Sequence, residues 1–407
     1  MGQRTITVIG GGASGMTAAI FAAREGARVT ILEHQDRVGK KLLVTGNGRC
    51  NFSNRHMDAS CYRSGDPDFP MEVIRRFPPE MTLPFFQDLG IVARERDGLY
   101  YPYSGQASAV LDVLRAELFR RGVRLVTGCK IRRIRAEKTG FFVETDGDRY
   151  GSDRLILAAG SRAAPSTGSD GSGYELARSL GHTIIRPLPA LVQLRCREPF
   201  FKQVAGVRAQ GAVSLCAGGK LLASDRGELQ LTDYGISGIP VFQVSRFAAR
   251  ALDQGVRTEA RLDFYPETDR EGVLAMLRLR RAAAADRPLE TFFTGWLHKK
   301  LAALILKLEG LKPGRLSGEL TDGGLERLTE RIKAFPTEIA AVNSFEQAQT
   351  CCGGVKVQEV DPATMESRKK RGLYLAGEIL DVDGICGGYN LQWAWSTGAI
   401  AGTHAAL

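Results

Sequence analysis

Three glycines near the start of the chain have the spacing of a loop that binds a dinucleotide. Gly10, Gly12 and Gly15 form the pattern Gly-x-Gly-x-x-Gly directly after a short β-branched run. In such a loop the first glycine allows a sharp turn, the second lets backbone N–H groups approach a pyrophosphate, and the third lets a helix pack closely on the strand. The phosphates then meet the positive end of that helix. The motif therefore predicts a dinucleotide site at this turn.

An acidic residue follows at the position that selects the nucleotide. Glu33 stands at the end of an expected second strand, 28–32, and Gly26 ends the expected helix before it. A carboxylate at this point can accept hydrogen bonds from both hydroxyls of an adenosine ribose, and it would repel a 2′-phosphate. A glycine turn without a ligand is the less favoured alternative, because the full βαβ pattern is present. We expect FAD or NAD.

Two further glycine-rich polar loops favour FAD. The first, 45–51, reads TGNGRCN; its polar side chains and backbone N–H groups suit phosphates and a flavin edge, although a plain surface loop is the alternative. The second, 384–392, follows a buried run at 373–376 and leads into a helix expected from Trp393 to His404, so its backbone donors lie at a helix N-terminus. Asp383 beside it can bond a ribityl hydroxyl. Two separated loops suit FAD, because this cofactor is long and usually buried.

The elements that position these loops come from both ends of the chain. Residues 1–188 and 346–407 are expected to form one doubly wound α/β domain, because the buried run near the end needs a parallel sheet as its partner. Residues 189–268 contain short β-like runs without helices between them, which predicts an antiparallel sheet or small barrel. Helical spacing in 269–345 predicts a small helical domain.

The composition and charge of the chain indicate which kinds of partner to expect. The chain has 407 residues, of which 43% are hydrophobic and 25% charged. No apolar run reaches the roughly 18 residues of a membrane span, so we expect a cytoplasmic protein. The net charge of +10 is compatible with binding to nucleic acid. However, the basic residues are scattered and their densest runs lack interleaved aromatic residues, so a small-molecule substrate is favoured over nucleic acid. The sequence does not indicate an oligomeric state.

The eight cysteines give no sign of a metal centre. They show neither CxxC pairs nor histidine-linked spacing, so we expect no metal. Cys351 and Cys352 are adjacent, and adjacent cysteines form only a strained disulfide, so two free thiols in a loop are favoured. Cys50 and Cys386 lie in the two polar loops. A redox dithiol is possible there, but we favour small space-filling residues, because neither belongs to a CxxC pair.

Several motifs together resemble a known family. The N-terminal fingerprint with Glu33, the loop 45–51, the run DYGISG at 233–238, the run MES at 365–367 and the run from 377 to 392 are similar to those of the HI0933-like bacterial flavoproteins. This resemblance covers nearly the whole chain. It implies an FAD-dependent oxidoreductase with a discontinuous FAD-binding Rossmann-like domain, an inserted β-barrel and a small helical domain. The family includes aminoacetone oxidases and a bile-acid dienone reductase.

The resemblance also implies cofactor-binding positions. They are Gly10, Gly12, Ala13, Ser14 and Gly15 at the pyrophosphate, Glu33 at the ribose, Ile131 at adenine, Lys40, Asn47, Gly48, Arg49 and Cys50 in the second loop, and Gly377, Glu378, Asp383, Gly388, Tyr389 and Asn390 at the ribityl–flavin half. We add Ala159 and Gly160, which end a buried run. The family names no catalytic side chain. Tyr389 and Asn390 are our candidates for ring or substrate contacts.

Two versions of the chemistry stay open at this point. In a reductase, NAD(P)H reduces the flavin, which passes hydride to an activated C=C bond such as an enone. In an oxidase, a small amine such as aminoacetone reduces the flavin and O₂ reoxidises it. The chain has no second Gly-x-Gly-x-x-Gly, so we expect NAD(P)H to bind only transiently, as a co-substrate. We favour the reductase, and rank an RNA-associated flavoprotein and a flavin-binding sensor lower.

Overall fold

Both ends of the chain build the same parallel sheet. In the computed structural model, which describes residues 3–407, the strand order of this sheet is β20-β11-β1-β2-β7. The strands are β20 (Leu373–Leu375), β11 (Arg154–Leu157), β1 (Thr5–Ile9), β2 (Arg28–Leu32) and β7 (Arg124–Val126). β-Branched and leucine side chains bury β20, β11 and β1 on both faces, as central parallel strands require, whereas the edge strand β7 is largely exposed. The predicted Rossmann-like fold is confirmed.

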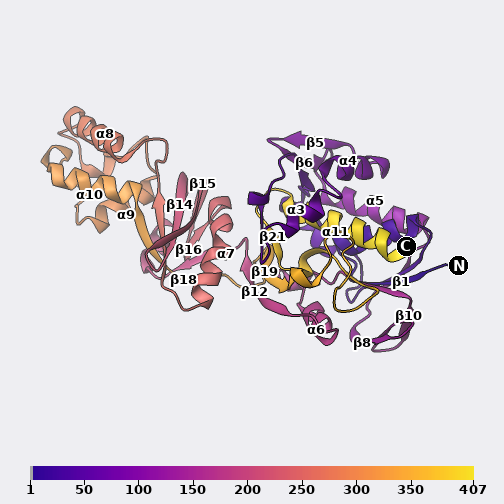
Figure 1. Cartoon of the computed structure of the whole chain (residues 1–407). Coiled ribbons are helices and arrows are strands. Elements are labelled where there is room, and N and C mark those ends of the chain that lie inside the picture. Colours follow the sequence, from indigo (N-terminus) through magenta and orange to yellow (C-terminus); the bar gives the residue numbers. More distant parts are fainter. Residues whose placement is uncertain (1–2) are drawn as a thin grey trace. The chain divides into compact units, whose positions relative to one another are not determined.

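The C-terminal helix packs directly on the helix of the glycine fingerprint. These two helices are α1 (Ala13–Arg24) and α11 (Tyr389–Ala406), drawn in indigo and yellow in Figure 1. A Cβ atom on Gly398 would lie 2.5 Å from the Ser14 carbonyl oxygen, and one on Gly402 would lie 2.2 Å from that of Ala18. Only glycine permits this approach, so the small residues of α11 are required by its contact with α1.

Among residues 3–188 and 349–407, four small sheets and five further helices accompany the parallel sheet. The sheets are β10 (Arg149–Ser152) with β9 (Gly140–Thr145) and β8 (Ile131–Glu137), β3 (Ser53–Asn54) with β6 (Leu99–Pro102) and β5 (Ala93–Arg96), β21 (Val382–Gly384) with β4 (Tyr62–Ser64), and β12 (Ile184–Ala190) with β19 (Thr350–Val355). The helices are α2 (Lys40–Leu43), α3 (Phe69–Ile74), α4 (Pro79–Asp88), α5 (Ala107–Arg120) and α6 (Ser172–Ser179).

One expectation about the cysteines was wrong. Cys351 and Cys352 carry free thiols, but they lie in the buried strand β19 and not in a loop. Gly353 and Gly354 belong to the same strand. Gly353 permits close backbone contact there, because a Cβ atom on it would lie 2.4 Å from the Arg186 carbonyl oxygen.

The chain divides into two compact units. One consists of Met1–Leu188 with Gln349–Leu407, and the other of Pro189–Ala348. The second unit contains a closed barrel with the strand order β13-β16-β15-β14-β17-β18. Its strands are β13 (Leu194–Cys196), β14 (Arg208–Ala217), β15 (Lys220–Thr232), β16 (Gly235–Ser237), β17 (Thr258–Asp263) and β18 (Phe335–Val342). This confirms the predicted barrel.

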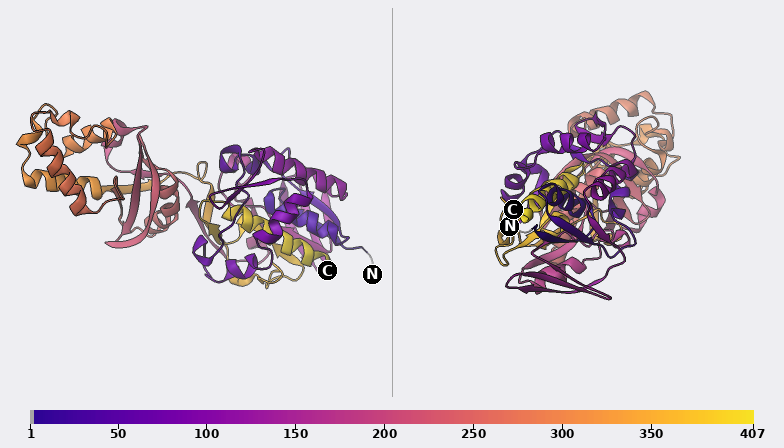
Figure 2. Two further views of the ribbon diagram at one scale, coloured as in Figure 1. Left: turned by 90° about the horizontal axis from the view of Figure 1, so that it is seen from above. Right: turned by 90° about the vertical axis from the view of Figure 1, so that its right-hand side faces the viewer.

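Four helices belong to the unit that holds the barrel. They are α7 (Ile239–Asp253), α8 (Arg270–Ala283), α9 (Lys299–Leu308) and α10 (Asp322–Lys333). Helix α7 packs against barrel strands, whereas α8, α9 and α10 gather at one end of the barrel, as both Figure 1 and Figure 2 show. The helices predicted for 269–345 are present as α8, α9 and α10. Helix α7 was not predicted, because it lies within 189–268, and strand β18 lies within 269–345, where it closes the barrel between β17 and β13. A domain boundary near residue 269 stays a prediction.

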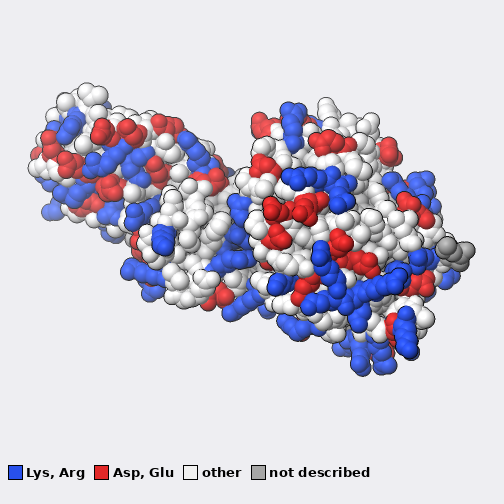
Figure 3. Space-filling model, in the orientation of Figure 1, with Lys and Arg blue, Asp and Glu red and all other residues white. Residues whose placement is uncertain are grey.

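The surface carries both basic and acidic side chains. On the face in Figure 3, Lys and Arg side chains are interspersed with Asp and Glu side chains on both units. Among residues 3–407, no helix combines the length and the apolar character that crossing a membrane demands.

A buried histidine makes the stability of the first unit depend on pH. Nδ1 of His182 lies 3.1 Å from Glu359 Oε2, and Nε2 lies 2.8 Å from Ser367 Oγ. Burial lowers the pKa of His182 below its ordinary value of 6.5, in spite of the carboxylate. The unfolded chain therefore binds a proton more readily than the folded protein does.

We expect the thermal midpoint to fall as the pH drops from about 6.5 towards 5, the window in which unfolded histidine becomes charged. Calorimetry of wild type and His182→Gln over this range tests the expectation, because the variant has no such group and should show a flatter curve. Hydrogen bonds from Thr183 lower the pKa of Glu359, although burial opposes them, so its own effect belongs to lower pH. Parallel curves for the two proteins would contradict the assignment.

Candidate cofactor site

The three fingerprint glycines have different surroundings. A Cβ atom on Gly10 would lie 2.4 Å from the Ala158 carbonyl oxygen, and one on Gly15 would lie 1.9 Å from that of Gly10. A Cβ atom on Gly12 would meet no protein atom within 4 Å. Gly10 and Gly15 are thus required by the packing of strand on helix, whereas Gly12 borders open space at the start of α1. Such space is what a pyrophosphate needs, so the loop fits the phosphates of FAD.

Glu33 joins the end of β2 to the fingerprint loop. Its Oε2 accepts a hydrogen bond of 2.7 Å from the Gly11 N–H, and its Oε1 accepts one of 2.8 Å from the Gln35 N–H. The residue is 9% exposed. A charged acceptor with two fixed donors is held in one orientation, so its free lone pairs have a defined direction. The carboxylate therefore shapes the loop as well as offering acceptors to a ribose.

Two predicted residues lie near Glu33 along the chain or in space. Lys40 begins α2, and its ammonium donates a 2.7 Å hydrogen bond to Gln35 Oε1. Ile131 begins β8, just after Cys129, whose N–H donates to the Glu33 carbonyl oxygen at 2.9 Å. These contacts bring Ile131 and Lys40 to the Glu33 end of the site.

The loop 45–51 has a strained backbone. It contains a short 3-10 turn, Thr45–Gly48, in which Asn47 has a φ of 53°. Cys50 has a φ of 56°. A left-handed conformation is uncommon for residues other than glycine, and such residues concentrate at functional sites. In the amide orientation that satisfies both groups, Asn51 donates to the Ser53 carbonyl oxygen and accepts from the Gly388 N–H at 3.1 Å. This contact ties the loop to the second glycine loop.

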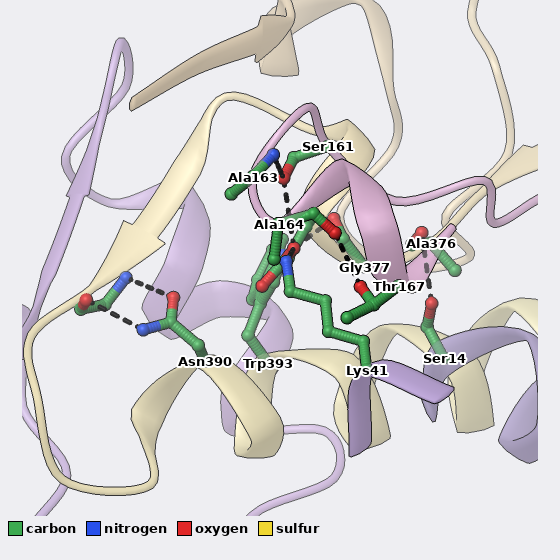
Figure 4. Close-up of polar contacts among 12 residues, drawn as sticks. Ser14, Lys41, Ser161, Ala163, Ala164, Thr167, Ala376, Gly377, Asn390 and Trp393 are labelled. Carbon is green, nitrogen blue, oxygen red and sulfur yellow. Dashed lines mark hydrogen bonds and ion pairs between the residues drawn. The ribbon is translucent and has the colours of Figure 1, made fainter. Parts of the chain in front are cut away.

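The second glycine loop is closed by Asn390. Its Oδ1 accepts a 2.8 Å hydrogen bond from the Gly384 N–H, and its Nδ2 donates a 2.9 Å bond to the Gly384 carbonyl oxygen (Figure 4). Helix α11 begins at Tyr389, four residues before the expected start, because Gly388 adopts a φ of 91° and ends the loop there. Asn390 therefore fixes the loop, and its contact with a ring stays a prediction.

Tyr389 is buried beside a second tyrosine. Its ring meets the ring of Tyr62 edge-on at a centroid distance of 5.9 Å, and the Tyr62 hydroxyl donates to the Tyr389 carbonyl oxygen at 3.0 Å. Burial, with a smaller contribution from a hydrogen bond to Cys61, raises the pKa of Tyr389 above its ordinary value of 10.0. The phenol thus keeps its proton at neutral pH.

Close to Tyr389 lies a group of possible metal ligands. Atoms of His56, Asp58 and Cys61 lie within 4.8 Å of one another. His56 and Asp58 already form an ion pair, and His56 is exposed. Because exposed polar clusters commonly hold no metal, the expected absence of a metal centre stays a prediction.

A hydrogen-bonded cluster holds Gly377 and Glu378 between α1, α2 and α11. Lys41 Nζ lies 2.5 Å from Glu378 Oε2, which also accepts a 3.1 Å bond from Ser161 Oγ. The Gly377 carbonyl oxygen accepts a 3.1 Å bond from Trp393 Nε1 (Figure 4). Sequence reasoning missed Lys41, Ser161 and Trp393. No local signal marks them, because each acts through a partner far away in the sequence.

Four other predicted residues are placed as follows. Ala159 and Gly160 follow β11, and the Cβ position of Gly10 lies 3.0 Å from the Ala159 Cα. Ser14 Oγ lies 3.4 Å from the Ala376 carbonyl oxygen. Asp383 is 2% exposed in β21. The structure thus gathers residues from both ends of the chain around the start of α1, and their roles in binding stay predictions.

Comparison with known proteins identifies the family of the chain. Residues 4–404 match the model of the HI0933-like protein Rossmann domain. The chain belongs to the HI0933-like family. It is 47% identical over 403 residues to the 3-dehydro-bile acid delta(4,6)-reductase of Clostridium scindens, with 98% of each chain covered. The predicted family and the predicted class, an FAD-dependent oxidoreductase, are confirmed.

A second relative and one solved structure are also similar to the chain. The chain is 27% identical over 393 residues to the ribosomal RNA dihydrouridine synthase of Escherichia coli, covering 96% of this chain and 95% of that protein. Among solved structures, 3-ketosteroid delta1-dehydrogenase from Sterolibacterium denitrificans matches with a TM-score of 0.51 at 14% identity, covering 99% of this chain and 100% of that chain. This last likeness concerns the fold alone.

The two loop cysteines are expected to be dispensable for flavin reduction. Burial raises the pKa of the Cys50 thiol to about 12, so the reactive thiolate is absent at neutral pH. We expect Cys50→Ser and Cys386→Ser each to keep most of the NADH-driven rate of flavin reduction, measured by anaerobic stopped flow. Loss of reduction in both single variants, with FAD still bound, would instead identify a redox pair.

Proposed function

We propose that this protein reduces an activated C=C bond of an enone-like small molecule, with hydride supplied by NAD(P)H by way of FAD. The supporting observation is the 47% identity, over 98% of both chains, to a protein named as a delta(4,6)-reductase of a 3-dehydro bile acid. At this identity and coverage the reaction class is expected to be shared, while the acceptor need not be a bile acid. We also propose a cytoplasmic location.

The residues around α1 fit FAD as the resident cofactor. When bound, FAD accepts hydride from one molecule and delivers it to another. The open space at Gly12 and the start of α1 suit its pyrophosphate, and the Glu33 carboxylate suits its ribose hydroxyls. The loops 45–51 and 384–388, tied together through Asn51, would flank its ring.

Proton handling at the site is limited by the groups present. The raised pKa of Tyr389 keeps the phenol protonated, so this side chain suits a hydrogen-bond donor to a carbonyl oxygen more than a strong acid. Lys41, paired with Glu378, would be a cation near the proposed ring end of the site. It would favour negative charge that develops on the ring or on an enolate.

An assay with two arms tests the proposal. In the anaerobic arm, purified protein is mixed with NADH or NADPH and a conjugated enone, and we expect loss of NAD(P)H to match loss of enone. In the aerobic arm, aminoacetone is added without NAD(P)H, and peroxide is measured. Peroxide release from the amine, with no enone reduction, would identify the alternative, a flavin oxidase. Free FAD at equal concentration is the control in both arms.

An RNA substrate is the second candidate, because a relative of 27% identity is named a ribosomal RNA dihydrouridine synthase. The lower identity and the mixture of basic and acidic side chains on the face in Figure 3 favour the small molecule. Deletion of the gene followed by measurement of dihydrouridine in ribosomal RNA separates the two. An unchanged dihydrouridine content is expected.

A further inference from the structure

The hairpin of β5 and β6 places its arginines on one face. Arg94 is paired with Tyr101, and Arg96 with Leu99. Because side chains alternate along a strand, these four share a face, whereas Glu95 points to the other one. There Glu95 forms an ion pair with Arg55. The Glu95 carboxylate thus points away from the face that carries the Arg94 and Arg96 guanidinium groups.

This face lines a pocket that a third arginine completes. The pocket has a volume of about 450 Å³, within the usual range for small ligands, and Arg49 and Tyr103 also line it. Among the described residues that line it, Asp97 is the single acid, and its carboxylate lies 3.6 Å from Arg96 Nε. Three guanidinium groups therefore face one carboxylate, and the excess positive charge favours an anionic ligand.

The pocket borders both loops that we assign to the flavin ring. Arg49 belongs to the loop 45–51 itself. On the other side, Leu99 Cδ2 lies 3.4 Å from the Cβ position of Gly387. Asn54, in the strand beside β6, donates a 2.9 Å hydrogen bond to the Gly387 carbonyl oxygen. A ligand in this pocket is thus held next to the predicted ring site.

We propose that this pocket binds the phosphates of the nicotinamide dinucleotide that reduces the flavin. Arg49, Arg94 and Arg96 would contact the pyrophosphate, and a tyrosine of the same face would pack against the adenine. Guanidinium groups match phosphate oxygens in two-pronged contacts, and three of them exceed what a single carboxylate requires. Tyrosine rings offer flat area for a base. The proposal rests on the proposed function, since it assigns a site to its hydride donor.

The pocket would also provide the phosphate recognition that a second dinucleotide requires. The chain has one glycine fingerprint, which the FAD site uses, so a donor dinucleotide needs another means of phosphate recognition. Exposed arginines bind anions with modest affinity and fast exchange, because solvent competes for them. This suits a co-substrate that must enter and leave in every cycle.

The test uses holoenzyme carrying Arg94→Gln with Arg96→Gln. Anaerobic stopped flow measures flavin reduction against NADH concentration. We expect the apparent Kd for NADH to rise about tenfold or more, and the limiting rate at saturation to stay within about twofold, since two charge-assisted contacts are lost away from the reacting atoms. Binding of ADP-ribose, followed by calorimetry, should weaken in parallel. The double replacement by lysine should restore part of both.

Controls separate this result from general damage. Arg76→Gln removes an exposed arginine of the same unit and should leave NADH binding unchanged. FAD content, and reduction by dithionite, should match wild type in every variant. Equal Kd values for NADH in wild type and in the double glutamine variant would overturn the proposal.

Two other outcomes of these measurements would also overturn the proposal, each for a different reason. If the double variant binds NADH normally but a carboxylate-bearing enone poorly, while a neutral enone is unaffected, the pocket belongs to the acceptor and the proposal is overturned. If neither NADH nor NADPH reduces the wild-type flavin, the hydride donor in the proposed function is wrong, and the pocket assignment fails with it. The wild-type measurement alone identifies this last case.

Discussion

Replacing Gly12 with alanine is expected to weaken FAD binding strongly and to leave the stability of the apoprotein nearly unchanged. The new Cβ atom would meet no protein atom within 4 Å, and the φ of −79° suits alanine. The methyl group would instead enter the space that the pyrophosphate requires. We expect a penalty of about 1–3 kcal/mol on binding, which is roughly a 5- to 150-fold rise in Kd. Fluorescence titration of apoprotein with FAD gives the affinity, and calorimetry gives the stability.

Gly15→Ala is the matched comparison, because it adds the same methyl group three residues away. There the Cβ atom would lie 1.9 Å from the Gly10 carbonyl oxygen, so strand and helix must separate. We expect a loss of about 3 kcal/mol in the free energy of unfolding, even without FAD. If Gly12→Ala lowered apoprotein stability as much as Gly15→Ala, or bound FAD normally, Gly12 would not border the pyrophosphate.

Glu33→Ala is expected to harm both FAD binding and stability. The carboxylate accepts hydrogen bonds from the Gly11 and Gln35 N–H groups. Alanine has no carboxylate, so both backbone donors lose their acceptor. An unsatisfied buried donor costs about 1–3 kcal/mol, and the lost ribose contacts should weaken FAD by a similar amount. A thermal midpoint lowered by several degrees in the apoprotein, together with weaker FAD, is the expected pair of results.

Glu25→Ala provides the control for this experiment, since Glu25 is exposed at the end of α1. It should change neither quantity. A Glu33→Ala protein that keeps wild-type affinity for FAD would show that the ribose lies elsewhere. A protein that stays as stable as wild type would show that the two backbone donors find other acceptors.

The glycine fingerprint was predictable because each of its residues answers a local requirement. The turn after β1, the start of α1 and the acid at the end of β2 lie within 29 consecutive positions from Thr5 to Glu33, so spacing alone relates them. The last strand of the sheet was also predictable. A short, fully apolar run such as 373–376 has few places in a soluble protein other than a covered parallel sheet.

Other features depend on contacts that spacing does not encode. Leu99–Pro102 form β6 because β3 and β5 provide partners on both sides, and neither partner is evident from the spacing of residues around β6. Lys40 and Lys41 are equivalent in sequence. Only the fold shows that Lys41 meets Glu378, which lies 337 positions further along the chain.

The contact between α1 and α11 has a consequence for how the protein is made. Synthesis delivers the chain from its N-terminus, so the fingerprint helix emerges long before residues 373–407. Until then β11 lacks its neighbour β20, and the side of α1 around Ser14 and Ala18 lacks the helix that covers it. The barrel unit, by contrast, is continuous in sequence, so its folding is not expected to wait for these residues. FAD capture is therefore expected only after residues 373–407 have emerged, and a nascent chain stalled before β20 should stay colourless.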